Sequence, residues 1–146
     1  MHAGPKHLTG NDQENNRQGV VNFFNEQAFR EGALRGLEGG VVNGKAHSLM
    51  QAFNRLGFTG CSLSKALNTD VVRGEWGYVG HIETDAIGAV TTGYKTAFEA
   101  MMAAGTDSFC LDTQHQSSAA IVQAIRSNDD RIYAPAAAPG RQEYSV

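Results

Sequence analysis

Apolar residues recur at helical spacing in the first third of the chain. The stripe consists of Val20, Phe24, Ala28, Leu34 and Leu37. Charged residues such as Glu26 and Arg35 fall on the other side of the same helix. This pattern predicts an amphipathic helix of about five turns. We expect it to end at Gly39-Gly40, because glycine commonly follows the last residue of a helix.

The rest of the chain alternates between short apolar segments and helical patterns. The first ten residues are expected to hold the end of a strand, and further strands are predicted at 46–53, 79–85 and 106–112. Helices are predicted at 62–72, with Ser62 as its N-cap, at 94–104 and at 117–126. Strand starts roughly 30 to 40 residues apart are typical of parallel βα units. Since eight such units close a (β/α)8 barrel of roughly 250 residues, we predict an α/β fold of about four βα units, half of a TIM-type barrel.

The composition fits a folded domain and excludes several classes of protein. Of the 146 residues, 41% are hydrophobic and 18% charged, and the net charge of -3 leaves no basic surface for nucleic acid. Cys61 and Cys110 are far apart, without a CxxC partner, and cannot form a zinc site on their own. No apolar run approaches the roughly 20 residues of a membrane span. The start of the chain lacks the pattern of a signal peptide, and the compartment of a longer parent protein, cytoplasmic or secreted, is left open.

Polar side chains follow the predicted strands at their C-terminal ends, where functional groups gather in parallel α/β proteins. The candidates are Lys6, His7, Phe53-Asn54-Arg55, Asp85, and Asp112 with Gln114 and His115. An ammonium, an imidazole and a carboxylate that meet at one rim can bind hydroxyls and act on a carbon centre. The alternative interpretation is that each is an ordinary polar loop residue.

Two further motifs point to other chemistry. Strand alternation places His81, Glu83 and Asp85 on one face, which predicts either a metal site or a hydrogen-bonded polar cluster. Residues 39–45 (GGVVNGK) match the start of a phosphate-binding loop. However, Ala46 follows without a hydroxyl, and a helix precedes the glycines where a strand is needed. We interpret this segment as the loop that ends the first helix.

Several ordered stretches together resemble glycoside hydrolase family 3 of the β-glucosidase type. They are Lys6-His7-Leu8, 11–17 (NDQENNR), 25–31 (NEQAFRE), 50–57 (MQAFNRLG), 67–80 (LNTDVVRGEWGYVG), Thr84-Asp85 and 104–107 (AGTD). The resemblance is to the second half of the family's N-terminal barrel domain. It assigns residues 1–131 to the C-terminal half of that barrel and residues 132–146 to an irregular tail.

The resemblance implies roles for individual residues. Asp85 matches the nucleophile that attacks the anomeric carbon, and Lys6 and His7 match the pair that binds hydroxyls of the innermost sugar. Arg17, with Glu14, is expected to form ion pairs that position the pocket, and Phe53 stands where many members have a tyrosine. A cation such as Lys6 near Asp85 would favour an ionised nucleophile. The family needs no metal or other cofactor, so none is implied.

Three further positions depart from the family. Glu83 and His81 occupy strand positions that are usually apolar, and Ala86 replaces a common tryptophan. Charge in a barrel interior is costly unless it is paired, and a smaller residue at 86 leaves a smaller wall beside the sugar.

The implied function is hydrolysis of O-glycosidic bonds of β-glucosides by a retaining double displacement, which uses two carboxyl groups roughly 5 to 5.5 Å apart. In the family, the acid/base glutamate and an aspartate and arginine of the same subsite come from regions outside these residues. We therefore expect a truncated piece with little activity alone. Its partners would be a β-linked sugar or aryl glucoside, and the missing barrel half or a second copy.

Two other functions stay open at this point. One is a non-catalytic sugar-binding or assembly fragment that completes a barrel with another chain, because a half barrel leaves two sheet edges unpaired. The other is a metal-dependent α/β enzyme that uses His81, Glu83 and Asp85.

Overall fold

A computed structural model of the chain describes residues 3–17, 19–87, 97–112 and 115–127. The strands are β1 (Val21–Asn22), β2 (Ser48–Met50), β3 (Arg55–Leu56), β4 (Thr59–Gly60) and β5 (His81–Glu83). The α-helices are α1 (Glu26–Ala28), α2 (Arg35–Glu38), α3 (Phe98–Ala103) and α4 (Gln116–Arg126). Three π-helical segments, η1 (Phe29–Leu34), η2 (Gly39–Asn43) and η4 (Ala66–Glu75), and the 3-10 turn η3 (Cys61–Leu63) complete the described elements.

Parallel strand pairing organises the molecule. β2 pairs with β5 in parallel, with Leu49 opposite Ile82. Isolated parallel bridges extend this pairing on both sides, from Leu8 to Gln51 and from Glu83 to Ser108. The segment around Leu8, β2, β5 and the segment around Ser108 therefore lie side by side in that order. The predicted α/β class, with parallel strands connected through helices, describes this arrangement.

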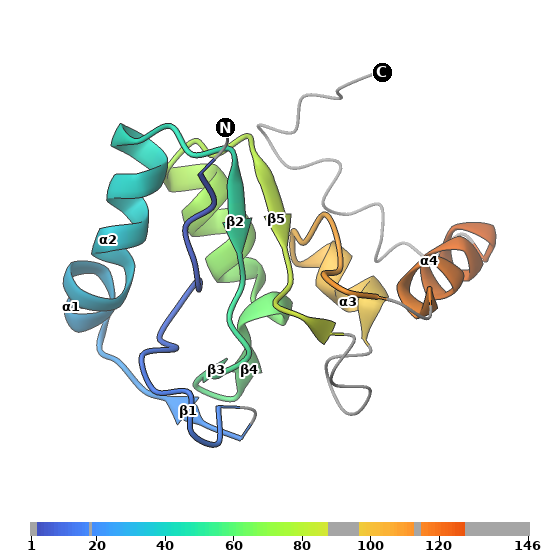
Figure 1. Cartoon of the computed structure of the whole chain (residues 1–146), viewed down its shortest axis with the longest axis horizontal. Coiled ribbons are helices and arrows are strands. Elements are labelled where there is room, and N and C mark those ends of the chain that lie inside the picture. The colour runs from blue at the N-terminus through green and yellow to red at the C-terminus, as the bar shows by residue number, and fades with distance from the viewer. Residues whose placement is uncertain (1–2, 18, 88–96, 113–114, 128–146) are drawn as a thin grey trace.

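One face of β2 and β5 is packed against helices. In Figure 1 the two strands occupy the centre, with α1 and α2 on one side, α3 and α4 on the other and the green η4 behind them. Leu49 and Ile82 are fully buried, whereas their neighbours Met50 and Glu83 are half-buried and His81 is exposed. The buried cluster around these two strand residues includes Leu8, Leu34, Val41, Leu67, Val72 and Tyr78. The opposite face of the strands is the one that carries polar groups.

The first helix begins and ends later than its apolar spacing predicts. Val21–Asn22 is strand β1, paired in parallel with Arg55–Leu56, so the predicted start at Val20 is wrong. The helix starts after Asn25, whose side chain accepts a hydrogen bond from the Ala28 N–H at 2.8 Å. It also runs past Gly39-Gly40 to Asn43. A Cβ at Gly40 would lie 3.1 Å from the Pro5 ring, so this glycine permits a close approach inside the helix rather than ending it.

The later predictions are confirmed in position and corrected in length. Strands predicted at 46–53 and 79–85 contain β2 and β5, and the predicted strand 106–112 is reduced to the bridge at Ser108. Ser62 is not the helix cap; Ser64 Oγ accepts from the Leu67 N–H at 3.2 Å, and η4 continues to Glu75. α4 agrees with its prediction, and α3 lies within the described part of 94–104. The predicted tail, 132–146, lies outside the described residues.

An ion pair joins η4 to the strand ends. Arg73 Nη2 lies 2.6 Å from Asp107 Oδ2 and donates to the Gly105 carbonyl, while Arg73 Nη1 donates to the Gly80 carbonyl. Asp107 Oδ2 also accepts from the Ile82 N–H at 2.8 Å. These contacts hold β5 and the segment that follows α3 in register. No helix in the described ranges is long and apolar enough to cross a membrane.

Candidate active site

Asp85 lies two residues beyond β5, at the C-terminal end of the strand. The Thr84 N–H donates to the Ser108 carbonyl, which fixes the backbone just before it. Asp85 is 8% exposed, and its Oδ1 accepts a hydrogen bond from the Ala86 N–H at 2.8 Å. Its Oδ2 is buried and has no hydrogen-bond partner among the described residues. One carboxylate oxygen is therefore hydrogen-bonded to the backbone, while the other makes no hydrogen bond to the described residues.

Two basic side chains face the free oxygen of Asp85. His7 Nε2 and Arg17 Nη1 each lie 3.5 Å from Asp85 Oδ2. Both distances are longer than a usual N–H···O hydrogen bond, but they are close enough for attraction between opposite charges. His7 comes from the strand segment that pairs with the end of β2, and Arg17 comes from the loop that follows it. Two parts of the chain that lie far from position 85 in the sequence thus meet at one carboxylate.

Arg17 is held in place by an anion and an aromatic ring. Its Nη1 lies 3.2 Å from Glu14 Oε1, and its guanidinium carbon lies 5.0 Å from the centre of the Phe53 ring. Phe53 is itself buried. A guanidinium over an aromatic face gains a cation–π attraction. Phe53 therefore contacts the arginine that faces Asp85, and it supplies no hydroxyl.

The cation beside Asp85 is Arg17 rather than Lys6. Lys6 is exposed, and among the described residues no ion pair joins it to Asp85. Its charge reaches this region, since it contributes to lowering the pKa of His7. Arg17 is thus the cation that lies within 4 Å of Asp85, whereas Lys6 acts on this region through its charge without an ion pair to Asp85 among the described residues.

The other candidates at the strand ends have structural roles or lie elsewhere. Asp112 accepts from the N–H groups of Gln116 and Ser117 at the start of α4. Burial raises the pKa of this carboxyl, but the hydrogen bonds from Ser117 and Gln116 and the charge of His115 together lower the pKa overall. Asn54 Nδ2 donates to the Thr9 carbonyl. Gln114 lies outside the described residues.

The metal-site alternative at His81, Glu83 and Asp85 is not formed. Within the described ranges no cluster of three or more His, Cys, Asp or Glu side chains is placed to hold a metal ion. His81 Nε2 lies 2.7 Å from Ser108 Oγ, while the Asp85 carboxylate faces His7 and Arg17. The strand ends at Glu83, so the alternation assumed for position 85 does not continue to it. The metal interpretation of these three residues is therefore wrong.

Asn11 is a contact of the site that no sequence pattern singles out. Its Nδ2 lies 3.2 Å from His7 Nδ1, on the side of the ring away from Asp85. The signal for it is weak: it stands four residues after His7 and opens the NDQENNR stretch. An asparagine in a loop is ordinarily part of a turn.

His7 makes the stability of the chain depend on pH. Burial lowers the pKa of His7 below its ordinary value of 6.5, against the opposing charge of Asp85. The unfolded chain therefore gains this proton first as the pH falls, and the free energy of unfolding should decline below pH 6.5. Above pH 6.5 the His7 ring is neutral in both the folded and the unfolded chain, so it does not change the free energy of unfolding. Urea unfolding of the unaltered chain and of His7→Gln, repeated at several pH values, measures this effect. The free energy of unfolding should fall less steeply with decreasing pH in His7→Gln. A steeper fall in the variant would contradict the lowered pKa of His7.

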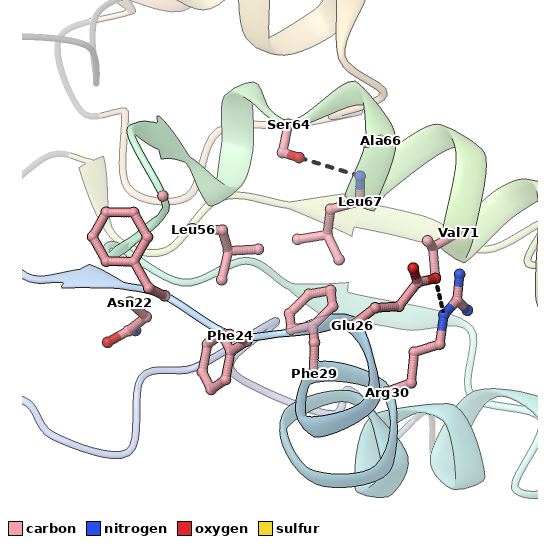
Figure 2. A pocket seen from close by; sticks show the side chains of 12 residues that line it. Asn22, Phe24, Glu26, Phe29, Arg30, Leu56, Ser64, Ala66, Leu67 and Val71 are labelled. Carbon is pink, nitrogen blue, oxygen red and sulfur yellow. Dashed lines mark hydrogen bonds and ion pairs between the residues drawn. The ribbon is translucent and has the colours of Figure 1, made fainter.

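Two cavities lie near these elements. One of about 700 Å³ is lined by Lys6, His7, Asn11 and residues of η1 and α2. The other, of about 460 Å³, lies between the first helix and η4, where Phe24 and Phe29 face Leu67 and Val71 (Figure 2). Neither His7 nor Asp85 lines this second cavity. The first cavity adjoins the candidate site through Lys6, His7 and Asn11, although Asp85 does not line it.

Comparison with known proteins gives consistent matches. A family model described as the glycosyl hydrolase family 3 N terminal domain matches residues 1–135. A β-glucosidase from Ruminococcus albus is 36% identical over 80 residues, which are 55% of this chain and 8% of that protein. The β-glucosidase BoGH3A from Bacteroides ovatus is 35% identical over 92 residues, 63% of this chain and 12% of its own.

A solved structure agrees with these sequence matches. β-Glucosidase 3B from Thermotoga neapolitana, in complex with glucose, superposes with a TM-score of 0.79 and 29% identity over 90% of this chain and 19% of that chain. The chain thus spans about a tenth of the curated relatives it matches and about a fifth of this structure.

Proposed function

The chain belongs to glycosyl hydrolase family 3, and from that premise we propose that Asp85 is the nucleophile of a retaining β-glucosidase. The observation that carries the proposal is the buried Asp85 Oδ2, free of hydrogen bonds and facing His7 and Arg17 at 3.5 Å. The relatives named as β-glucosidases support β-glucosides as the substrate class.

The proposed reaction runs in two displacements. Asp85 Oδ2 forms a bond to the anomeric carbon while the bond from that carbon to the aglycone oxygen breaks, and the aglycone leaves with that electron pair and a proton from an acid. Water then attacks the same carbon, loses a proton to the conjugate base and releases the carboxylate. Lys6 and His7 bind the sugar hydroxyls, and Arg17, stacked on Phe53, positions the carboxylate.

We also propose that the chain forms the second half of a (β/α)8 barrel domain. The parallel order of the Leu8 segment, β2, β5 and the Ser108 segment supports this. In the family, the acid/base glutamate and part of the innermost subsite come from other regions. We therefore expect that substrates with poor leaving groups are hydrolysed only when those regions are supplied.

The decisive test removes the need for an acid. The substrate is a 2-deoxy-2-fluoro-β-glucoside whose dinitrophenolate leaving group departs without protonation. The fluorine slows hydrolysis of the glycosyl ester formed on Asp85, so this covalent adduct should accumulate. We expect mass spectrometry of the labelled chain to place the sugar on the peptide that contains Asp85. Glu83→Gln, which alters a carboxylate two residues earlier, should be labelled equally. A label on another residue, or no label, would contradict the proposal; the latter favours a non-catalytic fragment.

A further inference from the structure

The imidazole of His7 lies between an amide and a carboxylate. Its Nδ1 is 3.2 Å from Asn11 Nδ2, and its Nε2 is 3.5 Å from Asp85 Oδ2. The side chain is 13% exposed, so water competes little for either nitrogen. Each ring nitrogen therefore faces one protein group, and those two groups decide which nitrogen of the neutral ring carries the proton.

The carboxylate favours one of the two neutral forms. With the proton on Nε2, the N–H of His7 points at Asp85, and Nδ1 accepts from the Asn11 amide. With the proton on Nδ1, the lone pair of Nε2 would face an ionised carboxylate, which only accepts hydrogen bonds. That second form places two acceptors against each other. It would also require Asn11 to turn its carbonyl oxygen toward the ring.

The far side of the Asn11 amide carries a cost in this orientation. Asn11 Oδ1 is buried and has no hydrogen-bond partner among the described residues, which costs free energy. If the amide were rotated by half a turn, Oδ1 could accept a hydrogen bond from the imidazole ring, but only if Nδ1 of His7 carried the proton. The structure has the amide in the orientation that leaves Oδ1 unpartnered and presents Nδ2 to the ring.

We propose that Asn11 is a positioning residue that fixes His7 as the tautomer protonated on Nε2, with that N–H aimed at the Asp85 carboxylate and at a sugar hydroxyl that enters beside it. The statement about the sugar rests on the proposed function, whereas the tautomer does not. The lowered pKa of His7, caused first by burial, keeps the ring neutral at neutral pH. The choice is then between two neutral tautomers.

Nitrogen-15 NMR of the full chain reads the tautomer without any substrate. The two ring signals of His7 are identified by their loss in His7→Gln. We expect Nδ1 to resonate as a nitrogen with a lone pair and Nε2 as a protonated nitrogen. Asn11→Ala should shift the tautomer ratio toward protonated Nδ1 by about tenfold, the equivalent of one net hydrogen bond.

A charge at position 11 gives the sharper test. In Asn11→Asp an ionised carboxylate faces Nδ1, so this nitrogen should become protonated and its resonance should move accordingly. Asn15→Asp adds the same charge to the same loop at an exposed position and should leave both resonances unchanged. Asn11→Ala serves if the aspartate variant does not fold. A protonated Nδ1 in the neutral ring of the unaltered chain, or no response to either substitution at Asn11, would overturn the proposal.

The two proposals fail separately. If Asp85 is not the nucleophile, the fluoroglucoside leaves it unlabelled while the NMR result for His7 is unaffected. If the tautomer is set by something other than Asn11, labelling of Asp85 proceeds while the ring signals do not respond to position 11.

Discussion

Asp85→Asn is expected to slow formation of the glycosyl adduct by on the order of ten-thousandfold, the scale seen when a covalent mechanism loses a central group. The amide keeps the size of the carboxylate, so the packing of this side chain beside His7 and Arg17 should be unchanged. Its oxygen carries no full negative charge and is a poor nucleophile toward an anomeric carbon. The rate is measured as the growth of the adduct mass on the intact chain with the dinitrophenyl fluoroglucoside.

Asp112→Asn is the matched control for this measurement. Asp112 is also an aspartate near the end of a strand segment, but its carboxylate accepts hydrogen bonds from Gln116 and Ser117 at the start of α4. We expect its substitution to lower stability through the lost cap and to leave the labelling rate within severalfold. Equal labelling rates for Asp85→Asn and the unaltered chain would show that Asp85 is not the nucleophile.

The meeting of Asp85 and His7 could be predicted from the sequence, whereas the surroundings of the carboxylate could not. Both residues follow strand segments, and parallel strands bring their C-terminal ends to one rim. Arg17 and Asn11 reach the site through the path of the loop after His7, and no periodic pattern encodes that path. The sequence therefore names Asp85, His7 and Arg17, but it does not show that Arg17 is the cation that lies 3.5 Å from the carboxylate.

The same division applies to the secondary structure. The alternation of strands and helices follows from local patterns, which is why β2, β5, η4 and α4 fall within or near their predicted ranges. Val20 and Phe24 fit a helix by spacing, yet Val21 pairs with Arg55, a residue far along the chain. Gly40 is explained by the ring of Pro5 rather than by a helix end. In both cases a tertiary contact overrides a local signal.

Ile82→Ala is expected to lower the free energy of unfolding by about 2 to 5 kcal/mol, the usual cost of removing a large buried side chain. Ile82 is fully buried among Leu8, Leu49 and Val72 at the centre of the β2–β5 pair. Its backbone N–H donates to Asp107 Oδ2, and this bond does not depend on the side chain. The loss therefore measures packing of the strands on the helices. Urea unfolding followed by circular dichroism gives the value.

Val79→Ala provides the comparison, because Val79 is 50% exposed and precedes the same strand. Its substitution should change the free energy of unfolding by less than about 0.5 kcal/mol. Domains of this size are stable by only about 5 to 15 kcal/mol, so Ile82→Ala removes a large share of the total. Ile82→Ala should also loosen the position of the Asp85 side chain, because β5 is the strand that presents this carboxylate to His7 and Arg17. Similar losses for Val79→Ala and Ile82→Ala would mean that the helix-facing side of β5 does not form the core.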